Sequence, residues 1–152
     1  MIPGIVNRNP FNIKNENPAD PWEGSIGVDE KGHCIFVDPI YAVRAACRDA
    51  ARKITHGKNT FRMFFAAYAP AADGNKPLGY AAFIASRLRH HFSGLTMDTP
   101  LTLFDTEGQV IDRFQLALFL SAMAEMELFN GYELETSALA SGIALYEHDF
   151  CR

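Results

Sequence analysis

The sequence predicts a mainly helical α+β domain with one small β-hairpin near its N-terminus. Two observations carry this prediction. From residue 38 onward, apolar residues recur at helical spacing after clear helix-start signals, whereas only residues 25–37 show the pattern of two short strands around a turn. Because 152 residues are enough for one domain with its own core, we expect a single domain over 1–152.

The first 24 residues are predicted to form an irregular arm. This segment is rich in proline and asparagine, which favour turns over helices and long strands. The hairpin follows at 25–37, and its turn is expected at 29–32, where Asp, Glu, Lys and Gly stand together. Residues 38–152 are predicted to be the helical part of the domain.

The helical part is predicted to contain five helices. Each begins at a residue that caps a helix or opens its first turn. These signals are Asp38 with Pro39, Asn59 with Thr60, Pro77, Asp112, and Glu135 with Thr136 and Ser137. The expected helices cover 40–54, 60–68 (ended by Ala69 and Pro70), 78–91, a long run from about 112, and 135–146, with a loop or extended piece at 96–105.

Composition and charge limit the functional classes. Apolar residues make up 48% and charged residues 21% of the chain, an ordinary globular balance, and the net charge of −4 argues against a general nucleic-acid binder. No uncharged apolar stretch is long enough to span a membrane. Three widely spaced cysteines favour reduced thiols. The N-terminus lacks the features of a secretory signal, so we expect synthesis in a cytoplasm without export by that route.

Glu127 is the sharpest functional signal in the chain. On a helix, Leu116, Leu120, Met123 and Glu127 fall on one face, whereas Glu125 points to the opposite side. We therefore expect a solvated Glu125 and a buried Glu127. Because burial disfavours the charged form of a carboxyl, the pKa of Glu127 should rise, and an acid that stays protonated near neutral pH suits general-acid chemistry.

Two other patterns favour ordinary structural roles. Arg44, Arg48 and Arg52 form a basic stripe at helical spacing with Asp49 beside it, which predicts a solvated face that an anionic polymer or another protein could meet. The histidines, including the adjacent pair at 90–91, lack the spacing of a zinc motif, so we expect no metal and no cofactor.

A series of short motifs gives the chain a family resemblance. Asn-x-Phe-x-Ile-Lys at 9–14, Trp-x-Gly at 22–24 and the following hairpin resemble the substrate-cleft segment of bacterial and phage glucosaminidases. The order of elements along most of the chain also resembles small phage virion-associated lytic proteins with lysozyme-like or lytic-transglycosylase-like folds. The matching residues are Asn9, Pro10, Asn12, Ile13, Trp22, Gly24, Phe36, Pro39, Arg44, Ala45, Ala69, Pro70, Asn75, Tyr80, Ala122 and Glu127.

The resemblance implies a lysozyme-like domain whose parts stand in a circularly permuted order, and cleavage of the glycan strand of peptidoglycan. Glu127 would act as the general acid and base. Glu23, Asp29 and Glu30 are the candidates for a second carboxylate, which many glycosidases require. The candidate substrate-binding residues are Asn9, Phe11, Asn12, Trp22, Tyr68 and Tyr80. The expected partners are the glycan strand and other virion proteins, and the protein would reach the cell wall in a virion or through lysis.

Two alternatives remain open at this stage. The chain could be a catalytically inactive virion structural or wall-binding protein on the same fold. It could also cut the peptide cross-link of the wall, which would normally require a metal or an activated nucleophile. No local signature supports a cysteine nucleophile.

Overall fold

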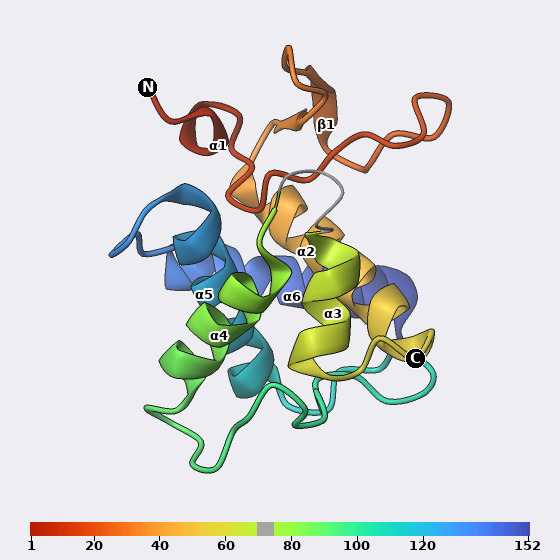
Figure 1. The fold of residues 1–152 in the computed structure, drawn as a ribbon. Helices are drawn as coiled ribbons and strands as arrows, with labels where there is room; N and C mark the ends of the chain where they lie inside the picture. The colour runs from red at the N-terminus through yellow and green to blue at the C-terminus, as the bar shows by residue number, and fades with distance from the viewer. Residues whose placement is uncertain (70–74) are drawn as a thin grey trace.

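The computed structural model describes residues 1–69 and 75–152. Within these residues the chain forms six helices and one two-stranded antiparallel sheet, which confirms the predicted mainly helical α+β class. The arm and the hairpin lie together on one side of the helical part, at the top of Figure 1. No helix in the described residues is long and apolar enough to cross a bilayer.

The arm contains one short helix that the sequence pattern did not predict. This helix, α1, covers Pro3–Val6 and begins with a proline, whose fixed backbone angle suits a first turn. The rest of the arm is irregular, as predicted. Arg8 and Asn12 both have a positive φ of 50°, so the backbone turns sharply on either side of Asn9.

The hairpin lies where it was predicted. Strand β1 covers Ser25–Val28 and strand β2 covers Cys34–Phe36. The Asp29 side chain accepts hydrogen bonds from the backbone of Lys31 and His33, both at 2.9 Å, and so closes the turn. The arm joins the sheet because the backbone N–H of Cys34 donates to the carbonyl of Ile13 at 2.8 Å.

The five predicted helices of the helical part all form. They are α2 (Pro39–Thr55), α3 (Phe61–Tyr68), α4 (Pro77–Leu88), α5 (Arg113–Leu128) and α6 (Thr136–Phe150). The side chains of Asp38, Thr60 and Asp112 accept backbone N–H groups in the first turns of α2, α3 and α5, as their cap signals predicted.

Two helix ends differ from the prediction. Helix α4 ends at Leu88 instead of 91, because the Leu88 carbonyl is taken by the N–H groups of His91 and Phe92 in a closing turn. Helix α6 continues to Phe150 instead of ending at 146, because the ring of Phe150 packs 5.5 Å from the ring of Tyr146 one turn earlier. Pro70, predicted to end α3, lies outside the described residues.

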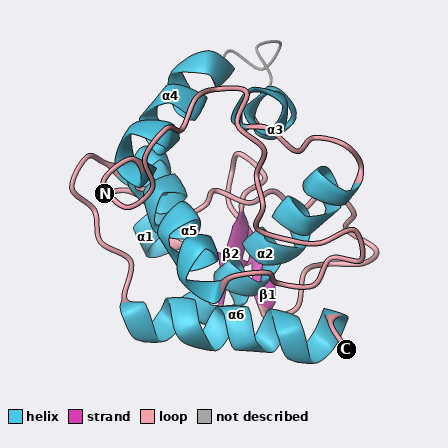
Figure 2. Ribbon diagram, turned by 90° about the horizontal axis from the view of Figure 1, so that it is seen from below, coloured by secondary structure: helices cyan, strands magenta, loops and turns pink. Residues whose placement is uncertain are grey.

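Close packing of helices fixes the position of the long helix α5. Its apolar face of Leu116, Leu120 and Met123 is fully buried, as predicted. Helix α6 runs along one edge of the molecule in Figure 2 and packs tightly on α2, since a Cβ at Gly142 would lie 2.3 Å from Val43. The two chain ends lie on different sides of the molecule in Figures 1 and 2, so the close termini that ease circular permutation are not a feature of this fold.

Candidate functional site

Glu127 lies in the last turn of α5, where this helix meets the arm. The approach is close, because a Cβ at Gly4 of α1 would stand 2.2 Å from the Leu128 side chain. The Asn12 side-chain amide donates to Glu127 Oε2 at 3.0 Å across 115 positions of sequence. Through this contact Glu127 faces the arm.

Burial governs the protonation of Glu127. Burial raises the pKa of its carboxyl above the ordinary value, as predicted, while the hydrogen bond from Asn12, the Tyr68 hydroxyl and the nearby charge of His33 oppose part of the rise. The single hydrogen of the Tyr68 hydroxyl points to the carbonyl of Phe11 at 2.9 Å, so this neighbour of the carboxyl is tied to the arm. The carboxyl is therefore an acid poised to carry a proton at higher pH than an exposed glutamate.

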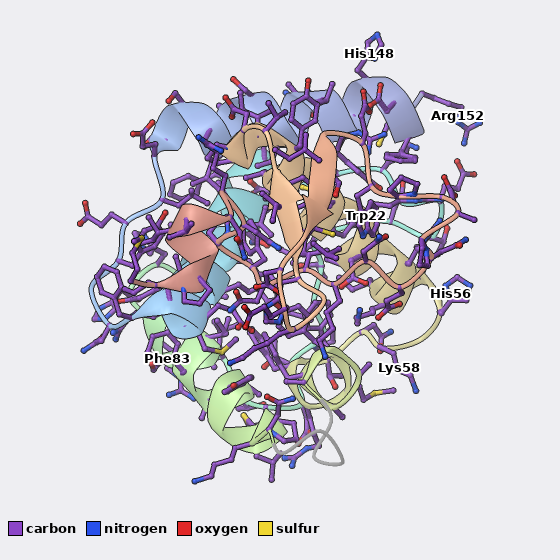
Figure 3. The ribbon with its side chains drawn as sticks, turned by 90° about the horizontal axis from the view of Figure 1, so that it is seen from above. Trp22, His56, Lys58, Phe83, His148 and Arg152 are labelled. Carbon is purple, nitrogen blue, oxygen red and sulfur yellow. The ribbon has the colours of Figure 1, made fainter. Side chains whose placement is uncertain are left out.

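A large cleft opens beside this carboxyl. Its volume is about 1160 Å³, and it runs between the arm, the hairpin, one face of α2 and the end of α3. Sites for small molecules usually enclose about 300–1,000 Å³, so this cleft has room for a segment of a polymer. Six of the predicted site residues line it: Phe11, Asn12, Trp22, Glu23, Tyr68 and Glu127. Trp22 is half-buried, packs against the core and is labelled in Figure 3, which looks down on the arm.

Two predicted substrate contacts are wrong. Asn9 is fully buried, and its amide is committed to backbone: Nδ2 donates to the carbonyls of Ile13 and Cys34, both at 2.9 Å, while Oδ1 accepts from the N–H of Ile13. Phe11 is 1% exposed, so its ring belongs to the core and offers no face to a sugar. Asn9 instead joins the arm to strand β2.

Tyr80 lies behind the cleft instead of in its wall. Burial raises the pKa of its hydroxyl, and the charge of Glu127 adds to the rise, so the two groups are neighbours. The Tyr80 hydroxyl donates to Asn75 Oδ1 at 3.4 Å, and Asn75 lines the cleft. The predicted role of Tyr80 as a direct substrate contact is therefore replaced by an indirect one.

Two of the three candidates for a second carboxylate lie outside the cleft. Glu30 is exposed in the hairpin turn, and Asp29 is used to build that turn. Burial acts to raise the pKa of Asp29, but its hydrogen bonds from the backbone of His33 and Lys31 and from Asn7 hold it below the ordinary value. Glu23 lines the cleft and pairs with Arg44 at 3.0 Å.

Asp49 is a carboxylate of the cleft that the sequence pattern did not predict. Asp49 lines the cleft, pairs with Lys53 at 2.6 Å, and acts together with Glu127 on the ionisation of Tyr68, whose pKa burial holds well above its ordinary value. The available signal was the place of Asp49 on α2, next to the basic stripe. Among the described residues, no group of three or more His, Cys, Asp and Glu side chains has a metal-binding arrangement.

Comparison with protein-family models and with curated proteins finds no match for this chain. The candidate site consequently rests on its own geometry.

The basic stripe of α2 is solvated only at its end, where Arg52 is exposed, and is covered at its start. Arg44, Arg48 and Arg52 all line the cleft. Arg44 is 9% exposed and is held between Glu23, at 3.0 Å, and Asp149 of α6, at 2.7 Å. The prediction failed because α6, which covers the first turns of the stripe, lies about 100 residues further along the chain.

Glu125 is also less solvated than predicted. Its side chain is 14% exposed and accepts from Arg87 Nε at 2.7 Å and from the backbone N–H of Gly131 at 2.7 Å. The Arg87 guanidinium holds the pKa of Glu125 below its ordinary value, opposite to the direction at Glu127. The pKa values of two glutamates separated by one residue thus move in opposite directions, because Arg87 binds Glu125 whereas burial dominates at Glu127.

Proposed function

We propose that this protein cleaves the glycan strand of peptidoglycan, with Glu127 as general acid and base, on a lysozyme-like domain of phage or prophage origin. One observation carries the proposal: a half-buried carboxyl with a raised pKa lines a polymer-sized cleft and is held there by the side-chain amide of Asn12 from the arm. The family resemblance supplies the substrate class and the virion or lysis route to the wall.

The chemistry begins with a proton transfer from Glu127. Its protonated carboxyl donates to the bridging glycosidic oxygen as the bond from that oxygen to the sugar C1 breaks. The carboxylate that remains is stabilised by the hydrogen bond from Asn12, which favours the charged form. The same carboxylate then takes a proton from the attacking hydroxyl, so the group acts first as acid and then as base.

The surroundings of Glu127 favour a route with one carboxylate. Glu23 and Asp49 line the cleft and are ion-paired, to Arg44 and Lys53 respectively, whereas Glu16 and Asp20 line it as exposed residues of the arm. None of these four carboxylates contributes to the pKa of Glu127, so the described residues place no second carboxylate beside the acid. In the transglycosylase route, a hydroxyl of the substrate attacks C1 and gives its proton to Glu127, which yields an anhydro-sugar. In the hydrolase route, water attacks and yields a reducing end. We favour the transglycosylase route because it needs no second free carboxylate.

The test compares the wild type with Glu127→Gln and Glu125→Gln on purified Gram-negative peptidoglycan. Glu127→Gln keeps the shape of the side chain but removes the proton, so activity should fall by about 10²–10⁴-fold. Glu125→Gln should lose stability but keep its activity per folded molecule, because Glu125 is bound to Arg87 and does not line the cleft.

Mass spectrometry of the products then identifies the reaction. Anhydro-muropeptides indicate a transglycosylase and reducing ends a hydrolase. Free peptide amines would show cross-link cleavage instead. A wild-type protein that binds peptidoglycan but releases no fragment would favour the inactive wall-binding protein, and equal activity of Glu127→Gln and the wild type would remove Glu127 from the mechanism.

A further inference from the structure

The cleft wall formed by α2 carries more positive charge than its own acidic residues neutralise. Four cations of α2 line the cleft: Arg44, Arg48, Arg52 and Lys53. Two of them are committed within the protein, Arg44 to Glu23 and Asp149, and Lys53 to Asp49. Within residues 1–69 and 75–152, Arg48 and Arg52 form no ion pair with a carboxylate.

The Arg48 guanidinium is held in place by an aromatic ring, while its Nε–H group lacks a hydrogen-bond acceptor among the described residues. Its guanidinium lies 4.4 Å from the centre of the Phe150 ring, and the Arg44 guanidinium lies 4.7 Å from the same ring. Arg48 Nε is buried and has no hydrogen-bond acceptor among the described residues. Stacking on an aromatic ring fixes the plane of a guanidinium but leaves its N–H groups free. Arg48 is thus a pre-oriented fork that lacks an acceptor.

Arg52 extends this feature along the same wall. It stands one helical turn after Arg48 on α2, is exposed, and lines the same cleft. Residues four apart on a helix lie on one face, so a single anionic group can meet both side chains. Exposure leaves the Arg52 side chain free to close on such a group.

Arg48 and Glu127 contact different ends of the cleft. Lys53 Nζ lies 5.8 Å from the centre of the Tyr68 ring, and the Tyr68 hydroxyl is a neighbour of Glu127. Arg48 instead reaches the C-terminal end of α6 at Phe150. A ligand that contacts both Glu127 and Arg48 therefore extends along α2, as a substituted polymer does and a small molecule does not.

We propose that Arg48 and Arg52 form a carboxylate-binding subsite, so that the cleft takes an acidic glycan in preference to a neutral one. A guanidinium fork matches the two oxygens of a carboxylate, and such charge-assisted pairs are stronger than neutral hydrogen bonds. The inference rests on the proposed function, since it names which feature of a peptidoglycan strand the cleft recognises. In an intact strand the peptide stem offers this group, whereas the lactyl ether offers it only where the stem has been removed from its amide.

The experiment measures binding apart from cleavage. Glu127→Gln protein, which should bind without cutting, is sedimented with intact sacculi and with chitin, which is neutral. Its binding to the soluble glycan strands that an amidase frees of peptide is measured by calorimetry. Adding Arg48→Gln should weaken binding to sacculi about tenfold, and adding Arg52→Gln should weaken it a few-fold. Lys58→Gln is the control, because Lys58 is exposed, lies outside the cleft and stands at the rim of the molecule in Figure 3.

Three further measurements show whether the arginines bind a carboxylate. Arg48→Lys keeps the charge but loses the fork, so it should restore only part of the affinity. Raising the salt from about 50 to about 500 mM should weaken binding by the parent more than by the Arg48→Gln, Arg52→Gln double variant. Chitin should bind weakly and equally to all variants. Loss of the arginine effect on the stripped strands assigns the recognised carboxylate to the peptide stem, and its retention shows that the subsite also takes the lactyl carboxylate that the amidase frees.

Equal binding of sacculi by the double variant and its parent, with equal salt dependence, would overturn the proposal. A parent protein that binds chitin as tightly as sacculi would do the same. Thermal melts show which variants are folded, and the exposed Arg52 keeps the test decisive where Arg48→Gln fails to fold. If the wild type releases no glycan fragments while binding still depends on the two arginines, the proposed function fails and the subsite stands.

Discussion

Replacing Asn9 by alanine tests whether this residue binds substrate or builds the site. Its side chain makes three hydrogen bonds to backbone, two from Nδ2 and one to Oδ1, between 2.9 and 3.0 Å. Each such bond contributes about 1 kcal/mol net, so Asn9→Ala should cost about 3 kcal/mol of the free energy of unfolding. For a domain of this size, about 1 kcal/mol shifts the melting temperature by about 2–4 °C, so the expected loss is about 6–12 °C.

The assay pairs urea unfolding with kinetics on soluble muropeptide substrate. Asn9→Ala should lower the unfolding midpoint, and activity per folded molecule should change little at a temperature where the variant is folded. Asn9→Asp turns a second carboxylate oxygen toward the carbonyls of Ile13 and Cys34 in a buried place, so at neutral pH it should be at least as destabilised as Asn9→Ala. A variant that loses less than about 1 kcal/mol while its KM rises tenfold would refute the structural role and restore Asn9 as a substrate contact.

Three further predictions concern protonation and packing. Asn12→Ala removes a hydrogen-bond donor that stabilises the charged form of Glu127, so the pKa of Glu127 should rise. The alkaline limb of the profile of kcat/KM against pH should then move to higher pH. An alkaline limb that does not move would exclude Glu127 as the titrating acid. Because the folded-state pKa of Glu127 lies above its unfolded value, its ionisation costs stability as the pH rises through that interval. Glu127→Gln should therefore match the wild type in acid and be more stable than the wild type in urea melts at neutral pH, and a constant difference across pH would contradict this. Gly142→Ala should lower the free energy of unfolding by about 1–3 kcal/mol because the new Cβ would clash with Val43. Gly79→Ala in α4 makes only an ordinary contact and should raise the free energy of unfolding by about 0.5–1 kcal/mol. Calorimetry that shows the same sign for both variants would refute the packing argument.

Features set by neighbouring residues were predictable from the sequence. The caps at Asp38, Thr60 and Asp112 act on N–H groups two or three positions away, so their patterns placed the helix starts correctly. The burial of one face of α5 also follows from spacing alone, and it carried the correct expectation that the pKa of Glu127 rises.

Features set by distant segments were not predictable in the same way. Asn9 was expected in the cleft, but the approach of strand β2, 25 positions away at Cys34, turns its amide inward. Arg44 was expected in solvent, but Asp149, 105 positions away, covers it. In each case the residue type predicts correctly that the side chain makes polar contacts. The partner from a distant segment decides whether those contacts are made within the protein or remain available to a ligand.

The carboxyl of Glu127 and the docking of the arm depend on each other. The hydrogen-bond partner of the carboxyl, Asn12, belongs to the arm, and its neighbour Tyr68 is tied to the arm through the carbonyl of Phe11. A molecule whose arm is displaced therefore loses the contacts of Glu127 with Asn12 and with the positioned Tyr68 at once. Such a molecule is not competent for the proposed proton transfer. Asn9 holds the arm to the hairpin. Removing its hydrogen bonds should therefore lower the fraction of competent molecules without altering the chemistry of those that remain. On this argument, activity lost by Asn9→Ala near its melting range should return on cooling, whereas activity lost by Glu127→Gln should not.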